Sequence, residues 1–304
     1  MCLTSCFLSR KAQHNLTFSN LTVENGLSQN SVMSTAQDST GLIWFGTRQG
    51  INRYDGYHFK NYSNTDKKVD AQQEVTSLLT DYKGMLWAGT NAGLKQYNLK
   101  KDSFEKTKDL SNELIELLFQ GKDKKLWVGT HKGLKLLVNR EEQKFKTFLF
   151  NPKLDDPSNS VYAMCEDKTG HIWVGTGGGL ILMSYQKGTF RFKKINFLTN
   201  PKAGYITAIA KDKHQNTWIG TSNGLYVLNN KAELSKTFLH TEGNPMSLVH
   251  NDIRELMLNE NGTMWIGTQN GLSIFNPSTG LFTNHQHNPE SIGSISHNSI
   301  HHLF

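Results

Sequence analysis

Short polar turns recur along the chain, and their side chains carry groups that bind hydroxyl-rich ligands. Guanidinium, amide and imidazole groups donate and accept hydrogen bonds, which is the chemistry that sugar recognition needs. An aromatic ring, such as that of Tyr57 or Tyr205, can stack on a sugar if it lies nearby. The alternative interpretation is that these are only the polar residues of hairpin turns. The candidate ligand-binding residues are Arg48, Asn91, His131, Asn223, Gln269 and Tyr57.

No residue has a pattern that predicts catalysis. Hydrolysis of a glycan needs two carboxylates about 5–10 Å apart in a cleft. The acidic residues instead recur in Asp-x-x-Gly turns such as Asp38 to Gly41, where a structural role is expected. The chain is therefore predicted not to be an enzyme, and a glycan-active enzyme is the weakest alternative.

No metal or cofactor site is predicted either. The glycine run Gly175 to Gly179 is not followed by Gly-Lys-Ser/Thr, so it indicates a hairpin turn and not a phosphate loop. The three cysteines, Cys2, Cys6 and Cys165, form no Cys-x-x-Cys pair, which disfavours a disulfide framework or a cysteine zinc site. Solvated loops are favoured over metal binding for the late histidines His285, His287, His297, His301 and His302.

The composition is that of an ordinary folded protein. In 304 residues, 33 Lys and Arg stand against 26 Asp and Glu, and the resulting charge of +7 does not by itself imply nucleic acid. No apolar run approaches the roughly 20 residues that span a bilayer. Residues 1–14 hold a short apolar patch but lack a charged n-region, so they are interpreted as the remnant of a clipped signal peptide.

A repeat built on tryptophan organises the rest of the chain, residues 15–304. Each tryptophan is followed two and three positions later by Gly-Thr, and six positions later by another glycine. A valine or isoleucine stands twelve positions before it. The six tryptophans are Trp44, Trp87, Trp127, Trp173, Trp218 and Trp265.

Each repeat predicts four antiparallel strands. An alternating strand precedes the Asp-x-x-Gly turn, the Trp-x-Gly-Thr segment forms the second strand, and two further strands follow a glycine turn. Four strands in about 44 residues match one blade of a β-propeller, and the large indole fills the space between blades. Two repeats lack the usual turn residues, at Gly121 to Lys124 and Asp212 to Gln215, so looser turns are expected there.

The fold class is therefore an all-β propeller with six complete blades and half of a seventh. The predicted blades are residues 30–72, 73–112, 113–158, 159–203, 204–250 and 251–297. Residues 16–23 and 298–304 resemble the outer and inner strands of a seventh blade whose middle strands are absent, with Ile300 at the repeated Val/Ile position. This suggests a chain that stops short of ring closure. A self-contained six-bladed ring is the alternative.

The motif Asp-x-x-Gly-x-x-Trp-x-Gly-Thr-x-x-Gly-Leu resembles the two-component regulator propeller repeat. Asn25 to Phe59 resembles the first blade of the sensor region in Bacteroidetes hybrid two-component systems. The resemblance covers residues 16–304. It implies the periplasmic sensor part of a membrane protein that continues into a second propeller, further sensor domains, a histidine kinase and a DNA-binding domain.

The resemblance also implies a function in signal transduction. The sensor would detect oligosaccharides, and the phosphorelay of the parent protein would control polysaccharide-utilisation genes. The second propeller and the remaining sensor domains would be its partners. The alternative is a protein-interaction or dimerisation propeller without a small ligand of its own.

Overall fold

The computed structural model describes residues 16–62, 73–197 and 205–304, and the predicted leader remnant lies outside these ranges. The chain forms six four-stranded antiparallel sheets, each with its strands in sequence order. The first three sheets are β1 (Val32–Gln37), β2 (Ile43–Thr47), β3 (Gly50–Tyr54) and β4 (Phe59–Tyr62); β5 (Val75–Thr80), β6 (Leu86–Thr90), β7 (Gly93–Asn98) and β8 (Ser103–Lys106); and β9 (Ile115–Gln120), β10 (Leu126–Thr130), β11 (Gly133–Asn139) and β12 (Lys144–Phe148).

The last three sheets repeat the same order. They are β13 (Val161–Glu166), β14 (Ile172–Thr176), β15 (Gly179–Gln186) and β16 (Thr189–Ile195); β17 (Ile206–Lys211), β18 (Thr217–Thr221), β19 (Gly224–Leu228) and β20 (Leu234–Phe238); and β21 (Ile253–Leu258), β22 (Met264–Thr268), β23 (Gly271–Asn276) and β24 (Leu281–His285). The described helices are two short 3-10 turns, η1 (Val23–Asn25) and η2 (Pro157–Asn159).

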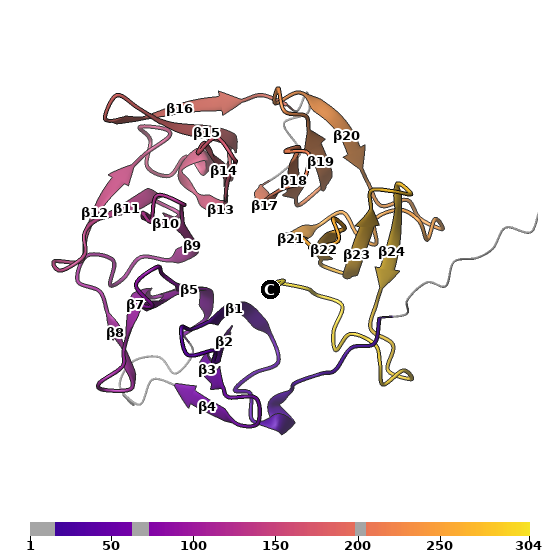
Figure 1. Cartoon of the computed structure of the whole chain (residues 1–304), viewed down its shortest axis with the longest axis horizontal. Coiled ribbons are helices and arrows are strands. Elements are labelled where there is room, and N and C mark those ends of the chain that lie inside the picture. The colour runs from indigo at the N-terminus through magenta and orange to yellow at the C-terminus, as the bar shows by residue number, and fades with distance from the viewer. Residues whose placement is uncertain (1–15, 63–72, 198–204) are drawn as a thin grey trace, which may run out of the picture.

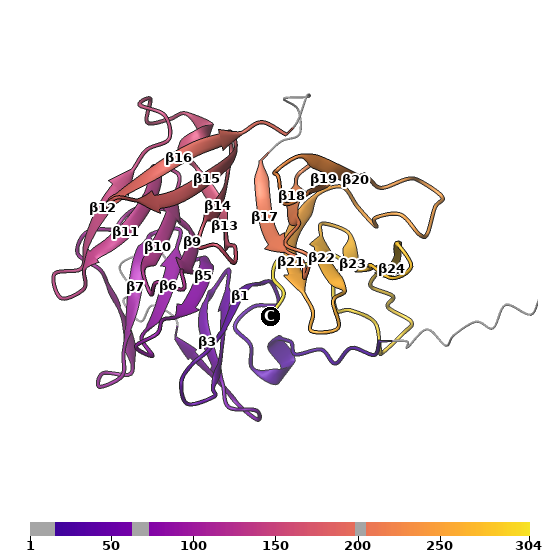
Figure 2. The ribbon, with the colours of Figure 1, turned by 45° about the horizontal axis from the view of Figure 1, so that its top comes forward.

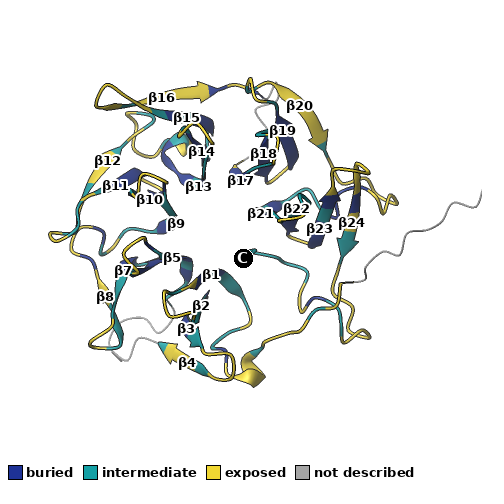
Figure 3. Ribbon diagram, viewed as in Figure 1, coloured by how far each residue is buried: buried dark blue, intermediate teal, exposed yellow. Residues whose placement is uncertain are grey.

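The six sheets stand around a common axis as the blades of a propeller (Figure 1). The first strand of each blade lines the centre and the fourth strand lies on the rim. Figure 3 shows the consequence for burial: the inner strands are largely buried, whereas the rim strands β4, β12, β16 and β20 are largely exposed. The predicted fold class, with six four-stranded blades, is confirmed, and every sheet falls within one of the predicted sequence units.

The tryptophans fill the spaces between neighbouring blades. Trp44 packs against Val75, Leu78 and Ala88 of the second blade, and Trp218 packs in the same way against the sixth. The first five indoles are nearly or fully buried, at 0–5% exposure. Trp265 of the sixth blade is only half-buried, because no four-stranded sheet follows it.

A glycine makes the blades fit closely at the centre. A β-carbon built on Gly220 would lie 2.5 Å from Cγ2 of Ile253, the repeated Val/Ile residue of the next blade. Gly46, Gly89 and Gly175 have the same relation to the next blade, with separations of 2.5–2.6 Å. The glycine of Trp-x-Gly-Thr is therefore required by the close approach of the neighbouring strand.

The indoles also tie the Asp-x-x-Gly turns to the second strands. Trp44 Nε1 donates to Asp38 Oδ2 at 2.7 Å, and Trp87 Nε1 donates to Asp81 Oδ2 at 2.8 Å. The expectation of looser turns in two repeats is wrong. Lys124 and Gln215 adopt the left-handed conformation (φ 65° and 67°) in place of glycine, and the turn hydrogen bonds are retained.

Both terminal segments lie in the seventh sector of the ring, between the sixth and first blades (Figure 1). They are not strands, contrary to the prediction for residues 16–23 and 298–304. The middle strands that would supply a hydrogen-bonding ladder are not present between them. Isolated bonds hold the segments instead, including Phe18 N to Gly293 O at 3.1 Å. Figure 2 shows the C-terminal end at the ring centre, near β1 and β21.

Candidate functional site

The β2–β3 type turns and the connections between blades share one end of the propeller. The backbone N–H of Asn91, in the β6–β7 turn, donates to the backbone carbonyl of Glu74 just before β5 (3.1 Å). The backbone N–H of Gln269 likewise donates to the backbone carbonyl of Asp252 before β21 (3.0 Å). These bonds recur because antiparallel strands return each turn to the start of the first strand. We call this end the mouth face.

A β-bulge lies at the same place in the first strand of all six blades. The register shifts at the residue directly after the repeated Val/Ile, for example between Val32 and Ser34 and between Ile253 and Glu255. A bulge leaves one residue outside the ladder and re-aims its side chain. One residue of each blade is thereby released from the sheet pairing near the centre of the ring.

These bulge residues surround a cavity of about 290 Å³ on the propeller axis. His301, directly after Ile300, takes the corresponding position in the seventh sector. All seven side chains are half-buried. We call them the channel ring: Met33, Thr76, Glu116, Tyr162, Thr207, Arg254 and His301.

One side of the channel ring carries an acid and an aromatic pair. Glu116 Oε1 lies 2.6 Å from Nε2 of His131, the predicted residue of the β10–β11 turn. The rings of His131 and Tyr162 pack edge-on with their centroids 5.7 Å apart, and the ring centroids of Tyr162 and Tyr205 are 5.8 Å apart. Imidazole, carboxylate and two phenol rings therefore form one contiguous cluster, of which Glu116 and Tyr162 line the cavity.

The opposite side carries a guanidinium network. Arg254 Nη2 donates to Gln269 Oε1 at 2.7 Å and to Asp252 Oδ2 at 2.9 Å. Ser299 Oγ contacts both Gln269 Oε1 (3.4 Å) and His301 Nε2 (3.1 Å). The Nε of Arg254 is buried and has no hydrogen-bond partner among the residues that the structure describes.

Burial and the neighbouring cations favour the neutral form of the His301 imidazole. Burial lowers the pKa of His301, and the nearby cations Arg254 and Arg48 lower it further. Arg48 is itself paired with Glu74, with Nε to Oε1 at 3.4 Å. A neutral imidazole both donates and accepts hydrogen bonds, as sugar hydroxyls do.

Two members of the channel ring have a structural role. Thr76 Oγ1 donates to the carbonyls of Ile115 (2.5 Å) and Gly89 (3.1 Å), and so joins the second and third blades. Thr207 bonds Ile253 and Gly220 in the same way. Their hydroxyls are therefore committed to holding the blades together.

The structure brings together some of the sequence-predicted residues and not others. Arg48, His131 and Gln269 contact channel-ring residues or their neighbours, as described above. Asn91 and Asn223 lie in mouth-face turns with exposed side chains. Tyr57 lies in the β3–β4 turn, at the opposite end of the blade, so its assignment to the mouth is wrong; Tyr205 is the aromatic residue at the mouth.

Sequence reasoning missed Glu116, Tyr162, Arg254 and His301. A signal was available, since each directly follows the repeated Val/Ile residue. The bulge that turns these side chains toward the axis has no sequence mark of its own. His301 and His302 are half-buried, and His302 Nδ1 lies 3.4 Å from Glu255 Oε2, so the interpretation of these two as solvated loop histidines is wrong.

Within residues 16–62, 73–197 and 205–304, no three His, Cys, Asp or Glu side chains gather as a metal site would require. Over the same ranges, no helix has the length and hydrophobicity to cross a membrane.

Comparison with known proteins supports the class that the repeat predicted. Residues 26–49 and 155–178 match the two component regulator propeller family. A 58-residue stretch, 19% of the chain, is 48% identical to histidine kinase P4 of Formosa agariphila, of which it covers 4%. The predicted resemblance to the two-component regulator propeller is confirmed.

Solved structures give the same result over nearly the whole chain. The extracellular domain of a hybrid two component system from B. thetaiotaomicron superimposes with a TM-score of 0.78 at 25% identity, over 95% of this chain and 37% of that one. Virginiamycin B lyase from Staphylococcus aureus shares the fold (TM-score 0.65) at 10% identity, over 85% of each chain. This chain therefore resembles extracellular sensor domains, and it spans well under two thirds of the sensor chain it matches.

Proposed function

We propose that this propeller is the periplasmic ligand-sensing module of a hybrid two-component signalling protein, and that it binds an oligosaccharide at the mouth of its central channel. The observation that carries the proposal is the channel ring. Its half-buried acid, guanidinium, imidazole and phenol groups face one cavity, and three sequence-predicted mouth residues adjoin them.

The chemistry of the ring suits a neutral, hydroxyl-rich ligand. Glu116 and Asp252 accept hydrogen bonds, Arg254 donates them, and neutral His301 can do either. The paired acids and bases balance one another, so the mouth offers many polar contacts without a strong net field. Tyr162 and Tyr205 supply aromatic faces on which a sugar ring can stack.

The proposed signalling role depends on a longer protein. The sensor chain from B. thetaiotaomicron extends well beyond the part that this chain matches. We propose that a second propeller and further sensor domains are its partners, and that a kinase relay carries the signal to polysaccharide-utilisation genes. In this account the propeller itself performs no catalysis.

Calorimetric titration with a panel of plant and host oligosaccharides tests the proposal. The wild-type protein is expected to bind one class of glycan, and Arg254→Met and Glu116→Gln should each weaken binding roughly tenfold. Arg48→Ala and Asn91→Ala test the outer mouth residues. Tyr57→Ala, at the opposite end, is the control. Unchanged affinity in all four mouth variants would contradict the proposed site.

A second candidate function is protein interaction, including a homodimer. Tyr57 and Leu99 are 85% and 80% exposed, and they lie in the β3–β4 and β7–β8 turns of adjacent blades, on the face opposite the mouth. Light scattering of the wild-type protein and of the Tyr57→Ser/Leu99→Ser variant tests this function. A dimer that the double variant abolishes would support it, and a monomer at all concentrations would exclude the homodimer.

A further inference from the structure

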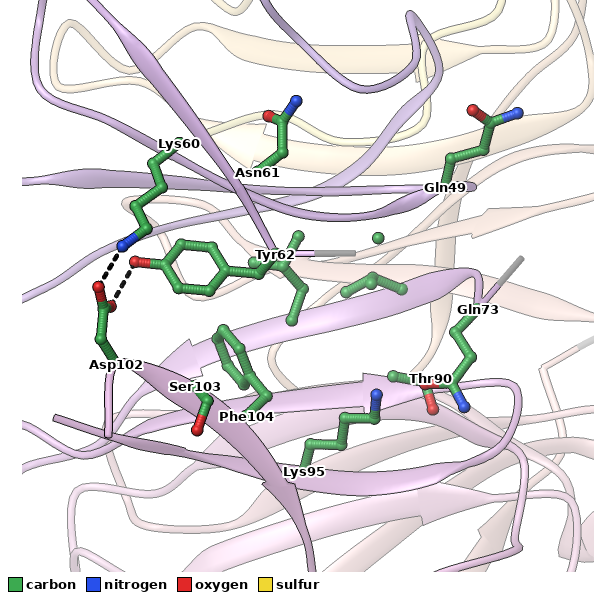
Figure 4. A pocket seen from close by; sticks show the side chains of 13 residues that line it. Gln49, Lys60, Asn61, Tyr62, Gln73, Thr90, Lys95, Asp102, Ser103 and Phe104 are labelled. Atoms are coloured by element: carbon green, nitrogen blue, oxygen red, sulfur yellow. Dashed lines mark hydrogen bonds and ion pairs between the residues drawn. The ribbon is translucent and has the colours of Figure 1, made fainter. Parts of the chain in front are cut away.

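A second cavity, separate from the channel, lies between the first and second blades. Its volume is about 260 Å³, and its walls come from β4 and β8 and from the beginnings of β3, β5 and β7 (Figure 4). Lys60, Tyr62 and Asp102 lie on one side of the view. Lys95 and Gln73 lie on the other.

The carboxylate of Asp102, which lines this cavity, already has hydrogen-bond and ion-pair partners within the protein. Asp102 accepts hydrogen bonds from Tyr62 (2.6 Å) and Tyr97 (2.5 Å), and it forms ion pairs with Lys60 and Arg53. These contacts hold the pKa of Asp102 well below its ordinary value. Asp102 thus tethers the two blades and is not the counter-ion of Lys95.

Lys95 is a buried cation without a counter-ion among the residues that the structure describes. Its side chain is 8% exposed, and it makes no hydrogen bond or ion pair with any of them. Its partner in the β7–β8 ladder is Lys106, which is also a cation. Nearby, Oε1 of Gln73 is buried and likewise has no partner in the described part of the chain. Burying an unpaired ammonium is costly, and an anion bound in the cavity would offset that cost.

In the third blade, the lysine at the equivalent position is neutralised by a carboxylate. Lys135 and Lys95 both stand eight residues after the tryptophan of their repeat. Lys135 Nζ lies 3.2 Å from the carboxylate of Glu113, which stands two residues before the repeated Val/Ile. The residue at that position in the second blade is Gln73. An amide thus replaces the carboxylate that would neutralise the lysine.

We infer that the cavity between the first two blades binds a small carboxylate ligand, whose carboxylate takes at Lys95 the place that Glu113 takes at Lys135. Lys60 lies at the other side of the cavity, and the amides of Gln73 and Asn61 supply further hydrogen bonds. The rings of Tyr62 and Phe104 line the wall. Together these groups suit a hydroxylated acid, either a sugar acid or a free hydroxy acid. The site is independent of the proposed channel site.

Substitutions at Lys95 and Gln73 test the inference. Wild-type protein is titrated calorimetrically with glucuronate, lactate, acetate, glucose and sulfate. Gln73→Glu recreates the Glu113–Lys135 pair inside the protein, and Lys95→Met removes the charge at similar volume. Both variants should lose glucuronate and lactate binding by roughly tenfold or more, because one charge-assisted contact is lost. Gln73→Glu should also raise the unfolding midpoint, which shows that it folds.

The remaining probes and one control separate the possible outcomes. Preference for glucuronate over lactate assigns the site to sugar acids, and the reverse assigns it to free hydroxy acids. The channel variant Glu116→Gln should bind both acids normally, which distinguishes this site from the channel. The inference is overturned if glucose or sulfate binds as well as the acids. The inference is also overturned if none of the carboxylates binds the wild-type protein, or if Gln73→Glu binds glucuronate and lactate as tightly as the wild-type protein does.

Discussion

Gly267 of the sixth blade lies against Ile300 of the C-terminal segment. A β-carbon at Gly267 would approach Cγ2 of Ile300 to 2.8 Å, and the amide of Ile300 donates to Thr268 O at 2.9 Å. This is the contact that Gly220 makes with Ile253 between complete blades. Ile300 therefore occupies the inner-strand position of the seventh sector although no strand forms there, and it places His301 in the channel ring.

The close contact between blades predicts strong coupling between its two residues. Gly220→Ala should destabilise the protein by about 1–3 kcal/mol, because the added methyl group overlaps Cγ2 of Ile253. Ile253→Ala removes that atom, so the double variant should lose less stability than the sum of the two single variants. Urea unfolding of all four proteins measures the coupling. Strict additivity would contradict the packing described here.

The indole hydrogen bonds predict unequal effects of two similar substitutions. Trp87 and Trp127 are both fully buried, but Trp87 Nε1 donates to Asp81, whereas Trp127 Nε1 has no acceptor in the described structure. Trp→Phe removes similar volume at both sites. Trp87→Phe should therefore cost about 1–2 kcal/mol more than Trp127→Phe in chemical denaturation. Equal costs would mean that the indole–carboxylate bond adds nothing.

Asp81 should make the free energy of unfolding depend on pH in the acidic range. Burial alone would raise its pKa, but hydrogen bonds from Trp87, Arg140 and two backbone amides outweigh burial, so its pKa lies below the ordinary value. Its contribution is complete above the unfolded pKa of about 3.9 and is lost as pH falls through the lower folded pKa. Asp81→Asn should reduce stability at pH 7 and flatten this loss below pH 4. An unchanged pH profile of the unfolding free energy would exclude the role of Asp81.

The channel charges predict a measurable shift at His301. Because Arg254 is one of the cations that lower the pKa of His301, Arg254→Met should raise that pKa. Histidine ring resonances followed by NMR titration give the value. A pKa of His301 that does not move would show that Arg254 is not close enough to act on it.

The fold could be predicted from the sequence because the same packing problem is solved in every blade. An indole between sheets, a glycine against Val or Ile, and a turn before the second strand leave marks at fixed spacing. The terminal segments were harder to predict. Their residue types match strands, but the ladder partners that make a strand are missing.

The site could be predicted only in part. Arg48, His131 and Gln269 follow the Gly-Thr pair, so the hairpin rule placed them at the mouth. Tyr57 was misplaced, since residue type alone does not tell which hairpin end a ring occupies. The channel ring could not be predicted because it depends on a backbone bulge. The cavity between the first two blades could not be predicted because the contrast between Gln73 and Glu113 matters only once Lys95 is known to be buried.

Met33 reports most directly on the central claim that the channel mouth binds the ligand. It is the methionine of the channel ring, whereas Met264 is buried at the start of β22, at the end of its blade away from the mouth face. In protein labelled with ¹³C at methionine methyls and assigned with Met33→Leu, titration with a binding oligosaccharide should shift the Met33 resonance along the calorimetric binding curve. The Met264 resonance should stay in place. Saturable binding that leaves Met33 unmoved would contradict the account.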